Sequence, residues 1–299
     1  MIAIYQRELK AYFDSVTGWL CIAFLCAAAG LYFMVYNLFY GYPNFSIALY
    51  YSMFIFLVAV PILTMRSMAE ERRSKTDQLL LTSPCTVTGM VLGKYFAMLT
   101  VYAIPHVIFC FYPVVMSLAA GSTGTVYFAS DYASILAFFL LGAVYIAIGL
   151  LVSSLTESQV IAAVGTFGLL LLFYLWDSLL SFLSGDAAVT LIGLLLIVLG
   201  VCALLHALTG NNTITLLVGL AGAAAVVGVY VVNPSLYDDL LVNLLSLFSL
   251  NAAFQSFALE YVFDLGGLLL YVSMALKWAC RRFRNLAAGP LRVTVPSRR

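Results

Sequence analysis

The feature that most constrains this chain is a long segment without basic residues: no Lys or Arg occurs from residue 95 to residue 276. Apolar residues make up 64% of the chain and charged residues only 9%, whereas about a quarter of an average soluble domain is charged. Because an ionised side chain at bilayer depth is energetically costly, this pattern is typical of a membrane protein with many spans. The composition argues against a cytosolic enzyme, a nucleic-acid-binding protein and a disordered chain.

Apolar stretches long enough to cross a bilayer recur along the sequence. A spanning helix needs about 20 apolar residues, and runs such as LLVGLAGAAAVVGVYVV lack the alternation of barrel strands. We therefore predict an all-α polytopic membrane protein with about eight transmembrane helices. They are expected at residues 16–40, 46–65, 95–120, 132–153, 158–177, 188–209, 213–232 and 262–279.

Three groups of basic residues orient these spans. Arg7 and Lys10 form the first group, residues 66–94 hold the second, and the third lies at the C-terminal end. With an even number of spans all three face one compartment, which the positive-inside rule makes the cytoplasm. We expect a multi-pass protein of the plasma (inner) membrane with both termini in the cytoplasm, and acidic residues such as Asp131 on the outer side.

Three segments outside the spans have distinct characters. Residues 1–15 predict an amphipathic helix that lies in the membrane interface; a pure anchor and a helix that also touches a partner both stay open. Residues 233–261 are interrupted by polar groups and predict an external interfacial helix or a lid over the outer ends of the spans. Residues 280–299 form a basic cytoplasmic tail.

The most informative segment is the charged stretch of residues 66–94, which predicts a cytoplasmic helical hairpin. Glu71 and Lys75 are spaced i,i+4 and Glu70 and Arg73 i,i+3, spacings that favour ion pairs along a helix. Pro84 would end the first helix of the hairpin. One interpretation is a solvated connector; the other is a lever that receives force from a cytoplasmic protein.

The sequence carries no signature of catalysis. It has no GxxxxGK[ST] phosphate loop, no HExxH and no GxSxG, and its carboxylates map to interfaces or loops, which gives little support to self-powered secondary transport. We expect packing or hydrogen-bonding roles for His106 and His206, and no enzyme activity, metal, disulfide or bound cofactor. Several glycine pairs suit close helix packing: Gly142 with Gly149, Gly165 with Gly168, and Gly219 with Gly222.

Taken together, the order of elements and three segments resemble the permease subunits of type-2 ATP-binding-cassette (ABC) exporters, most of all their gliding-motility-type branch. The segments are MAEERRSKTDQLLLTSPCTVTGMVLGKYFA (68–97), GLLVSSLTESQVIAAVGTFGLLLLFYL (149–175) and FSLNAAFQSFALEYVFDLGGLLLYVSMALKW (248–278). The third departs from the family's pattern, because Gln255 and Ala258 stand where a basic residue is expected.

The resemblance implies one permease domain, residues 1–299, with a six-span core and an extra helix pair at 188–232. It implies pairing with a second copy or a sister permease, contact with membrane lipid, and separate ABC ATPase subunits that bind ATP and Mg²⁺. The family's coupling helix corresponds to the first segment, which implies ATPase contacts, and no catalytic role, for Glu70, Glu71, Arg72, Arg73, Lys75, Thr76, Asp77, Arg7 and Glu8. A membrane scaffold or assembly factor that docks a cytoplasmic protein, and an independent secondary carrier, are the alternatives.

Overall fold

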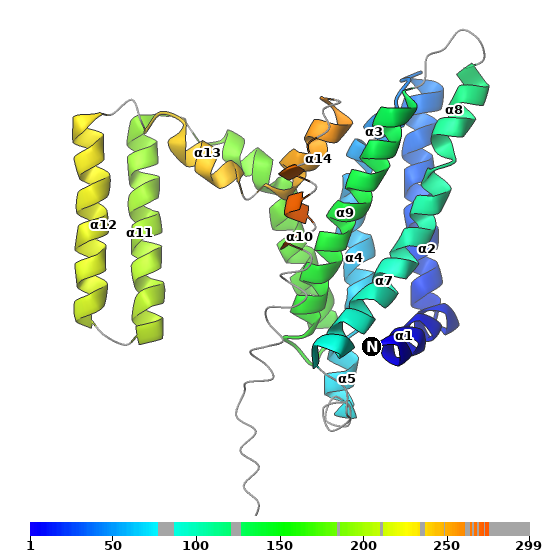
Figure 1. Cartoon of the computed structure of the whole chain (residues 1–299), viewed down its shortest axis with the longest axis horizontal. Coiled ribbons are helices and arrows are strands. Elements are labelled where there is room, and N and C mark those ends of the chain that lie inside the picture. The colour runs from blue at the N-terminus through cyan, green and yellow to red at the C-terminus, as the bar shows by residue number, and fades with distance from the viewer. Residues whose placement is uncertain are drawn as a thin grey trace, which may run out of the picture. The chain divides into compact units, whose positions relative to one another are not determined.

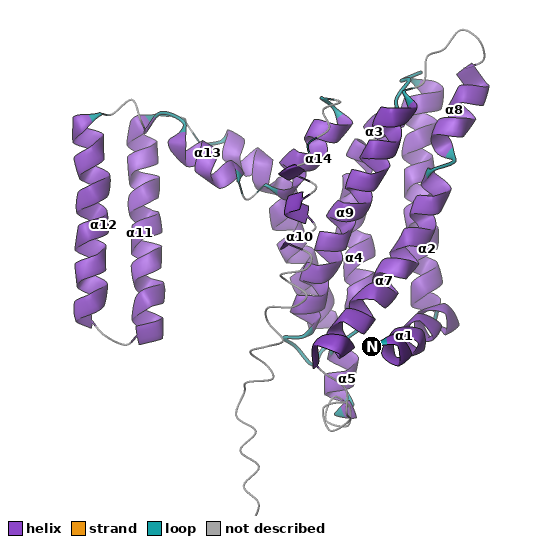
Figure 2. Ribbon diagram, viewed as in Figure 1, coloured by secondary structure: helices purple, strands orange, loops and turns teal. Residues whose placement is uncertain are grey.

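A computed structural model describes residues 1–76, 87–120, 127–183, 186–209, 212–233, 237–247, 249–260, 264, 266–267, 269–271 and 273–274. Throughout these residues the chain forms helices and loops and no strand (Figure 2), which confirms the predicted all-α fold. The chain divides into two compact units, one comprising Met1–Tyr174 and Ala253–Arg299 and the other Leu175–Ala252.

Five helices of the described chain are long and apolar enough to cross a membrane. They are Val16–Phe39, Phe45–Arg73, Thr88–Ala119, Phe128–Ser153 and Gln159–Ser181. The helices α13 (Leu240–Ser246) and α14 (Leu250–Ala258) make a sixth if they are taken as one broken span. The five agree with the first five predicted spans, and the predicted span 262–279 falls mostly outside the described residues.

Three of these spans consist of consecutive helical pieces (Figure 1). The first joins α2 (Val16–Phe33) to a π-helical turn, η1 (Met34–Phe39). The second joins α3 (Phe45–Tyr51), η2 (Ser52–Ile55) and α4 (Phe56–Thr64), and a turn then leads to α5 (Ala69–Arg73). The third joins α7 (Val87–Phe109) and α8 (Tyr112–Ala120), whereas α9 (Phe128–Ser153) and α10 (Gln159–Ser181) are continuous.

The predicted amphipathic helix at the N-terminus is confirmed as α1 (Ile2–Asp14). It lies across the ends of α2 and α7, at the same end of the bundle as α5 (Figure 1). Its apolar side buries Ile4 and Tyr12, and Gly93 lets it approach α7 closely, because a Cβ there would lie 3.1 Å from the Met1 carbonyl oxygen. Ser15 adopts an extended conformation and ends the helix before α2 begins.

Helix α9 forms the centre of the first unit. The ring of Phe138 packs at a tilt against that of Phe56 of α4, with centroids 4.5 Å apart, and the hydroxyl of Tyr102 on α7 donates to the Phe138 carbonyl at 3.0 Å. A Cβ at Gly142 would overlap Tyr102, and one at Gly149 would overlap Thr64. The predicted role of this glycine pair in close packing is therefore confirmed.

His106 has the packing and hydrogen-bonding role predicted for it. Its ring is 5% exposed, lies among the rings of Tyr102, Phe109 and Phe138, and places Nδ1 2.9 Å from the Tyr102 carbonyl oxygen. Its Nδ1 carries the hydrogen, since a carbonyl can only accept.

At the opposite end of the first unit, α14 covers the beginnings of α3 and α9. The hydroxyl of Ser46 donates to the Ala258 carbonyl at 3.0 Å, and that of Ser134 donates to the Phe257 carbonyl at 3.2 Å. Asp131 lies at this end of α9 and is completely buried within the protein. Its carboxylate accepts the N–H of Ser46 at 3.2 Å, so it caps the first turn of α3.

The second unit contains two helices at the positions of the predicted spans 188–209 and 213–232. Helices α11 (Ala187–Thr209) and α12 (Asn212–Val232) pack against each other. Their described apolar stretches, Ala187–Gly200 and Leu216–Val232, are too short to count among the five spanning helices, so the described chain has fewer spans than the predicted eight. A Cβ at Gly222 would lie 3.1 Å from Val198, so this glycine faces the neighbouring helix as predicted. Gly168 of α10 differs from the prediction, because the described part of the chain places no atom within 4 Å of a Cβ built there.

Candidate functional site

Four charged side chains from three helices meet at the end of the bundle where α1 and α5 lie. Arg7 of α1 donates to Glu8 at 2.6 Å and to Glu71 of α5 at 2.8 Å. Lys94 of α7 lies 3.1 Å from Glu8 and 2.8 Å from Glu71. Two cations and two carboxylates therefore form a closed ionic junction between α1, α5 and α7.

Lys94 is the buried centre of this junction. Only 1% of its side chain is exposed, and its ammonium donates to the Ser67 carbonyl at 2.9 Å as well as to Glu8 and Glu71. A lysine ammonium has three donors, and Lys94 has three oxygen partners here, two of them in hydrogen bonds and Glu71 in an ion pair. This full pairing explains how a charge can be buried. The sequence predicts a third span that begins at residue 95, directly after Lys94. In the structure α7 begins at Val87, so Lys94 lies inside the helix.

Arg7 closes the junction from the solvent side, with about half of its side chain exposed. Its hydrogen bond to Glu8 raises the pKa of the guanidinium above its ordinary value, and the negative charges of Glu8 and Glu71 add to this effect against the opposing effect of burial. In each of the two carboxylates a single oxygen, Oε1, accepts from both cations.

The ion pairs predicted along the charged helix are wrong. Glu70 pairs with Arg66, one turn earlier, rather than with Arg73. Glu71 binds the junction cations, and α5 ends at Arg73, after which Lys75 takes a left-handed backbone conformation with φ 55°. A helix that ends here cannot hold Glu71 and Lys75 at the i,i+4 spacing that the prediction needs.

The last residue of α9, Ser153, holds the start of α5. The buried hydroxyl of Ser153 accepts the N–H groups of Met68 and Ala69, both at 3.2 Å, and donates to the Met65 carbonyl at 3.2 Å. The two N–H groups are ones that a helix start leaves without partners inside the helix. Motion of α5 relative to α9 would therefore break hydrogen bonds.

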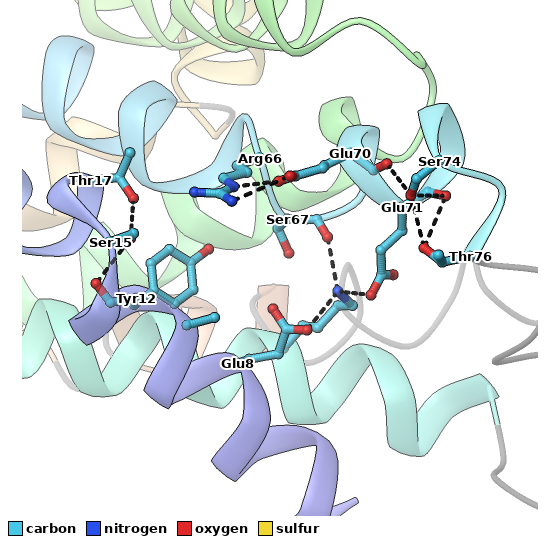
Figure 3. A pocket seen from close by; sticks show the side chains of 12 residues that line it. Glu8, Tyr12, Ser15, Thr17, Arg66, Ser67, Glu70, Glu71, Ser74 and Thr76 are labelled. Atoms are coloured by element: carbon cyan, nitrogen blue, oxygen red, sulfur yellow. Dashed lines mark hydrogen bonds and ion pairs between the residues drawn. The ribbon is translucent and has the colours of Figure 1, made fainter.

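A polar cavity of about 250 Å³ opens beside the junction (Figure 3). Its lining side chains come from α1, the start of α2, the turn before α5, α5 itself, the residues after it, and α7. They are Glu8, Ala11, Tyr12, Ser15, Thr17, Arg66, Ser67, Glu70, Glu71, Ser74, Thr76 and Lys94.

The hydroxyls of Tyr12 and Ser67 both line this cavity but differ in their hydrogen bonds. The Tyr12 hydroxyl donates to the Leu63 carbonyl at 2.9 Å, and burial raises the pKa of this phenol. The Ser67 hydroxyl is buried and has no hydrogen-bond partner of acceptable geometry among the described residues. Among the described residues no group of His, Cys, Asp and Glu is arranged to hold a metal ion.

The family model for "ABC-2 family transporter protein" matches residues 2–197. The chain belongs to the ABC-2 transporter family. The match extends from α1 into α11 and so contains the whole junction and its cavity. No curated protein and no solved structure matches the chain.

The chain is thus a multi-pass membrane component, or permease subunit, of an ABC transporter, and family membership implies association with ABC ATPase subunits. Of the residues predicted to contact an ATPase, the permease brings Arg7, Glu8 and Glu71 together and places Glu70 beside them. The other described ones lie at the end of α5 or just after it: Arg72 is half-buried, and Arg73, Lys75 and Thr76 are exposed. Asp77 lies outside the described residues.

The sequence does not identify three side chains that shape this site, Lys94, Ser67 and Ser153. Lys94 stood out only as one member of a basic group, and nothing local marked Ser67. Ser153 belongs to the family-like segment SSLTES. In this segment Thr156 caps locally, since its hydroxyl accepts the N–H of Ser158 at 3.1 Å, whereas Ser153 contacts the backbone of the second span.

Proposed function

We propose that this permease works in an ATP-driven exporter and that separate ATPase subunits drive it through α1 and α5. The observation that carries the proposal is the ionic junction, in which buried Lys94 ties Glu8 of α1 and Glu71 of α5 to the spanning helix α7. A solvated connector has no need of such a tie.

The contacts of α5 give a route by which force could reach the spans. Helix α5 continues the second span after one turn, Lys94 joins it to the third span, and Ser153 joins it to the end of α9. Because buried charges and buried amides are costly to leave unpaired, displacement of α5 would move these helices with it rather than separate from them.

In this proposal the end of the bundle that carries α1 and α5 faces the cytoplasm, as do both termini. Residues Arg72, Arg73, Lys75, Thr76 and Asp77 contact the ATPase directly, and Arg7 and Glu8 flank that contact. ATP and Mg²⁺ are bound by the ATPase subunits and not by this chain. A second copy or a sister permease completes the transporter. The resemblance to the gliding-motility-type branch stays part of the proposal, and the exported molecule is not specified.

A charge-reversal experiment tests the coupling. The double variant Arg73→Glu/Lys75→Glu changes two exposed residues that have no ion pair within the described chain. The permease is purified in detergent, and the ATPase that accompanies it is identified and quantified by mass spectrometry. We expect the double variant to insert normally but to lose most of the ATPase. Lys10→Glu, on an exposed position of α1, serves as the control for a change in net charge.

The same preparations decide between the proposal and its alternatives. In liposomes, substrate movement should require both the ATPase and ATP. Recovery of equal amounts of ATPase with the double variant would contradict the proposed contact. Transport by the purified chain alone would instead indicate a secondary carrier, and recovery of a different soluble protein in place of an ATPase would indicate a scaffold.

A further inference from the structure

We infer that the cavity between α1 and α5 is a receptor for one basic side chain, Lys or Arg, of the ATPase subunit. This inference rests on the proposed function and adds a defined binding pocket to it: besides inserting its own coupling segment into the ATPase, the permease would receive a side chain in return.

The carboxylate oxygens of the cavity that have no described partner are hydrogen-bond acceptors. They favour a ligand that donates hydrogen bonds. The ammonium of Lys94 already has three oxygen partners within the chain, and Arg66 directs two of its N–H groups at Glu70. Glu8 and Glu71 bind both junction cations through Oε1 alone, which leaves the Oε2 atom of each without a described partner. A Lys or Arg head group carries only donors and so complements these atoms.

The charge of the lining points the same way. Three carboxylates, Glu8, Glu70 and Glu71, line the cavity against two cations, Arg66 and Lys94, which leaves one excess negative charge. Arg7 balances it from outside the lining, with 51% of its side chain exposed to solvent. A basic side chain that enters the cavity would compete with half-exposed Arg7 for Glu8 and Glu71, and it would meet these carboxylates in a partly water-excluded space, where electrostatic attraction is stronger than in bulk water.

The buried hydroxyl of Ser67 is a second and independent sign of a ligand. Its side chain is 6% exposed and its oxygen has no hydrogen-bond partner of acceptable geometry among the described residues. The phenol oxygen of Tyr12 lies beside it and can accept the Ser67 hydrogen, while the phenol hydrogen goes to the Leu63 carbonyl, so the capacity left on the Ser67 oxygen is for a donor. Buried polar groups are nearly always paired, and a donor from a partner would supply the missing bond.

The size of the cavity fits such an occupant. A volume of about 250 Å³ holds the end of a long basic side chain together with water, each water taking about 30 Å³. A bare metal ion fits poorly, because the described carboxylates are not grouped as metal ligands. The amine of a lipid head group offers similar donors, and the experiment below separates it from an ATPase side chain.

The variant Ser67→Ala tests the pocket with two readouts that should move differently. Removing an unpaired buried hydroxyl should leave the thermal stability of the permease unchanged or raise it, because an unsatisfied group is lost. It should weaken binding of the ATPase by about three- to tenfold, the effect of one lost hydrogen bond. The control is Ser117→Ala, whose hydroxyl donates to the carbonyl of Val114 in its own helix and should change neither readout.

A photo-crosslinking amino acid at Ala11, which lines the cavity, identifies the occupant in the full complex. We expect a crosslink to an ATPase peptide that contains Lys or Arg, and no such crosslink from the neighbouring exposed position Lys10. Crosslinks from Ala11 to lipid only, or an unchanged affinity of Ser67→Ala, would overturn the inference.

The two proposals can fail separately. If no ATPase accompanies the wild-type chain, the proposed function fails and the pocket inference fails with it. If the ATPase binds and Arg73→Glu/Lys75→Glu releases it, while the Ala11 probe captures no ATPase peptide, only the pocket inference is overturned.

Discussion

The ammonium of Lys94 lies 2.8 Å from Glu71 and 3.1 Å from Glu8, so one buried cation on α7 holds carboxylates that belong to two other helices. Glu71 is 15% exposed and Glu8 13% exposed, which places both partners largely out of water. Removing the cation would leave two nearby negative charges with only half-exposed Arg7 between them. The junction is therefore sensitive to loss of Lys94 and much less so to loss of Arg7.

The first prediction concerns Lys94→Met, which keeps the length of the side chain and removes its charge. We expect the free energy of unfolding in detergent to fall by about 3 kcal/mol, because breaking a buried ion pair leaves its partners uncompensated. The triple variant Lys94→Met/Glu8→Gln/Glu71→Gln should recover most of this loss. A denaturant titration followed by tryptophan fluorescence measures both, and wild-type stability of Lys94→Met would show that the junction is not a structural tie.

The second prediction is that Arg7→Gln weakens binding of the ATPase but changes the stability of the permease little. With 51% of the Arg7 side chain exposed, its ion pairs should contribute less than about 1 kcal/mol to stability. Binding of the ATPase should nevertheless weaken measurably, because Arg7 lies at the surface proposed for that contact. Thermal unfolding and ATPase affinity are measured on the same sample. A loss of stability as large as that of Lys94→Met would mean that Arg7 is primarily structural.

Much of the helical organisation could be predicted from the sequence, because hydrophobicity and periodicity are local properties. The first five spans and α1 follow from runs of apolar residues and from the amphipathic spacing of residues such as Ile4 and Tyr12. The close approach at Gly149 could also be expected. Gly168 shows the limit of that rule, because a small residue permits close packing without showing that a neighbour is present.

The ionic junction could not be predicted, because its pairs join distant parts of the chain. Glu8 and Lys94 are separated by 86 positions, and a lone Lys beside an apolar run ordinarily marks the edge of a membrane. The i,i+4 rule pointed Glu71 to Lys75, but it assumes a helix that continues, and α5 ends at Arg73. Tertiary contacts with Arg7 and Lys94 therefore prevailed over the local pairing.

The third prediction tests the hydrogen bonds that Ser153 makes to the start of α5. Ser153→Ala leaves the N–H groups of Met68 and Ala69 without their acceptor, which should cost about 1–3 kcal/mol of stability. Hydrogen exchange at these two amides should accelerate, as followed by mass spectrometry. Ser154→Ala is the matched control, since the Ser154 hydroxyl donates to the Leu151 carbonyl of its own helix at 2.6 Å. Equal exchange in both variants would argue against a tie between α9 and α5.

The fourth prediction concerns the contact between α4 and α9 at Gly149. A methyl group there would overlap the side chain of Thr64, so Gly149→Ala must push the two helices apart and should lower stability by about 1–3 kcal/mol. Gly168→Ala meets no described atom within 4 Å and should be neutral or stabilising by up to about 1 kcal/mol, because Ala favours helix more than Gly does. Parallel unfolding titrations compare the two variants. If they behaved alike, the approach of α4 to α9 would be too loose to transmit motion from α5 into the centre of the bundle.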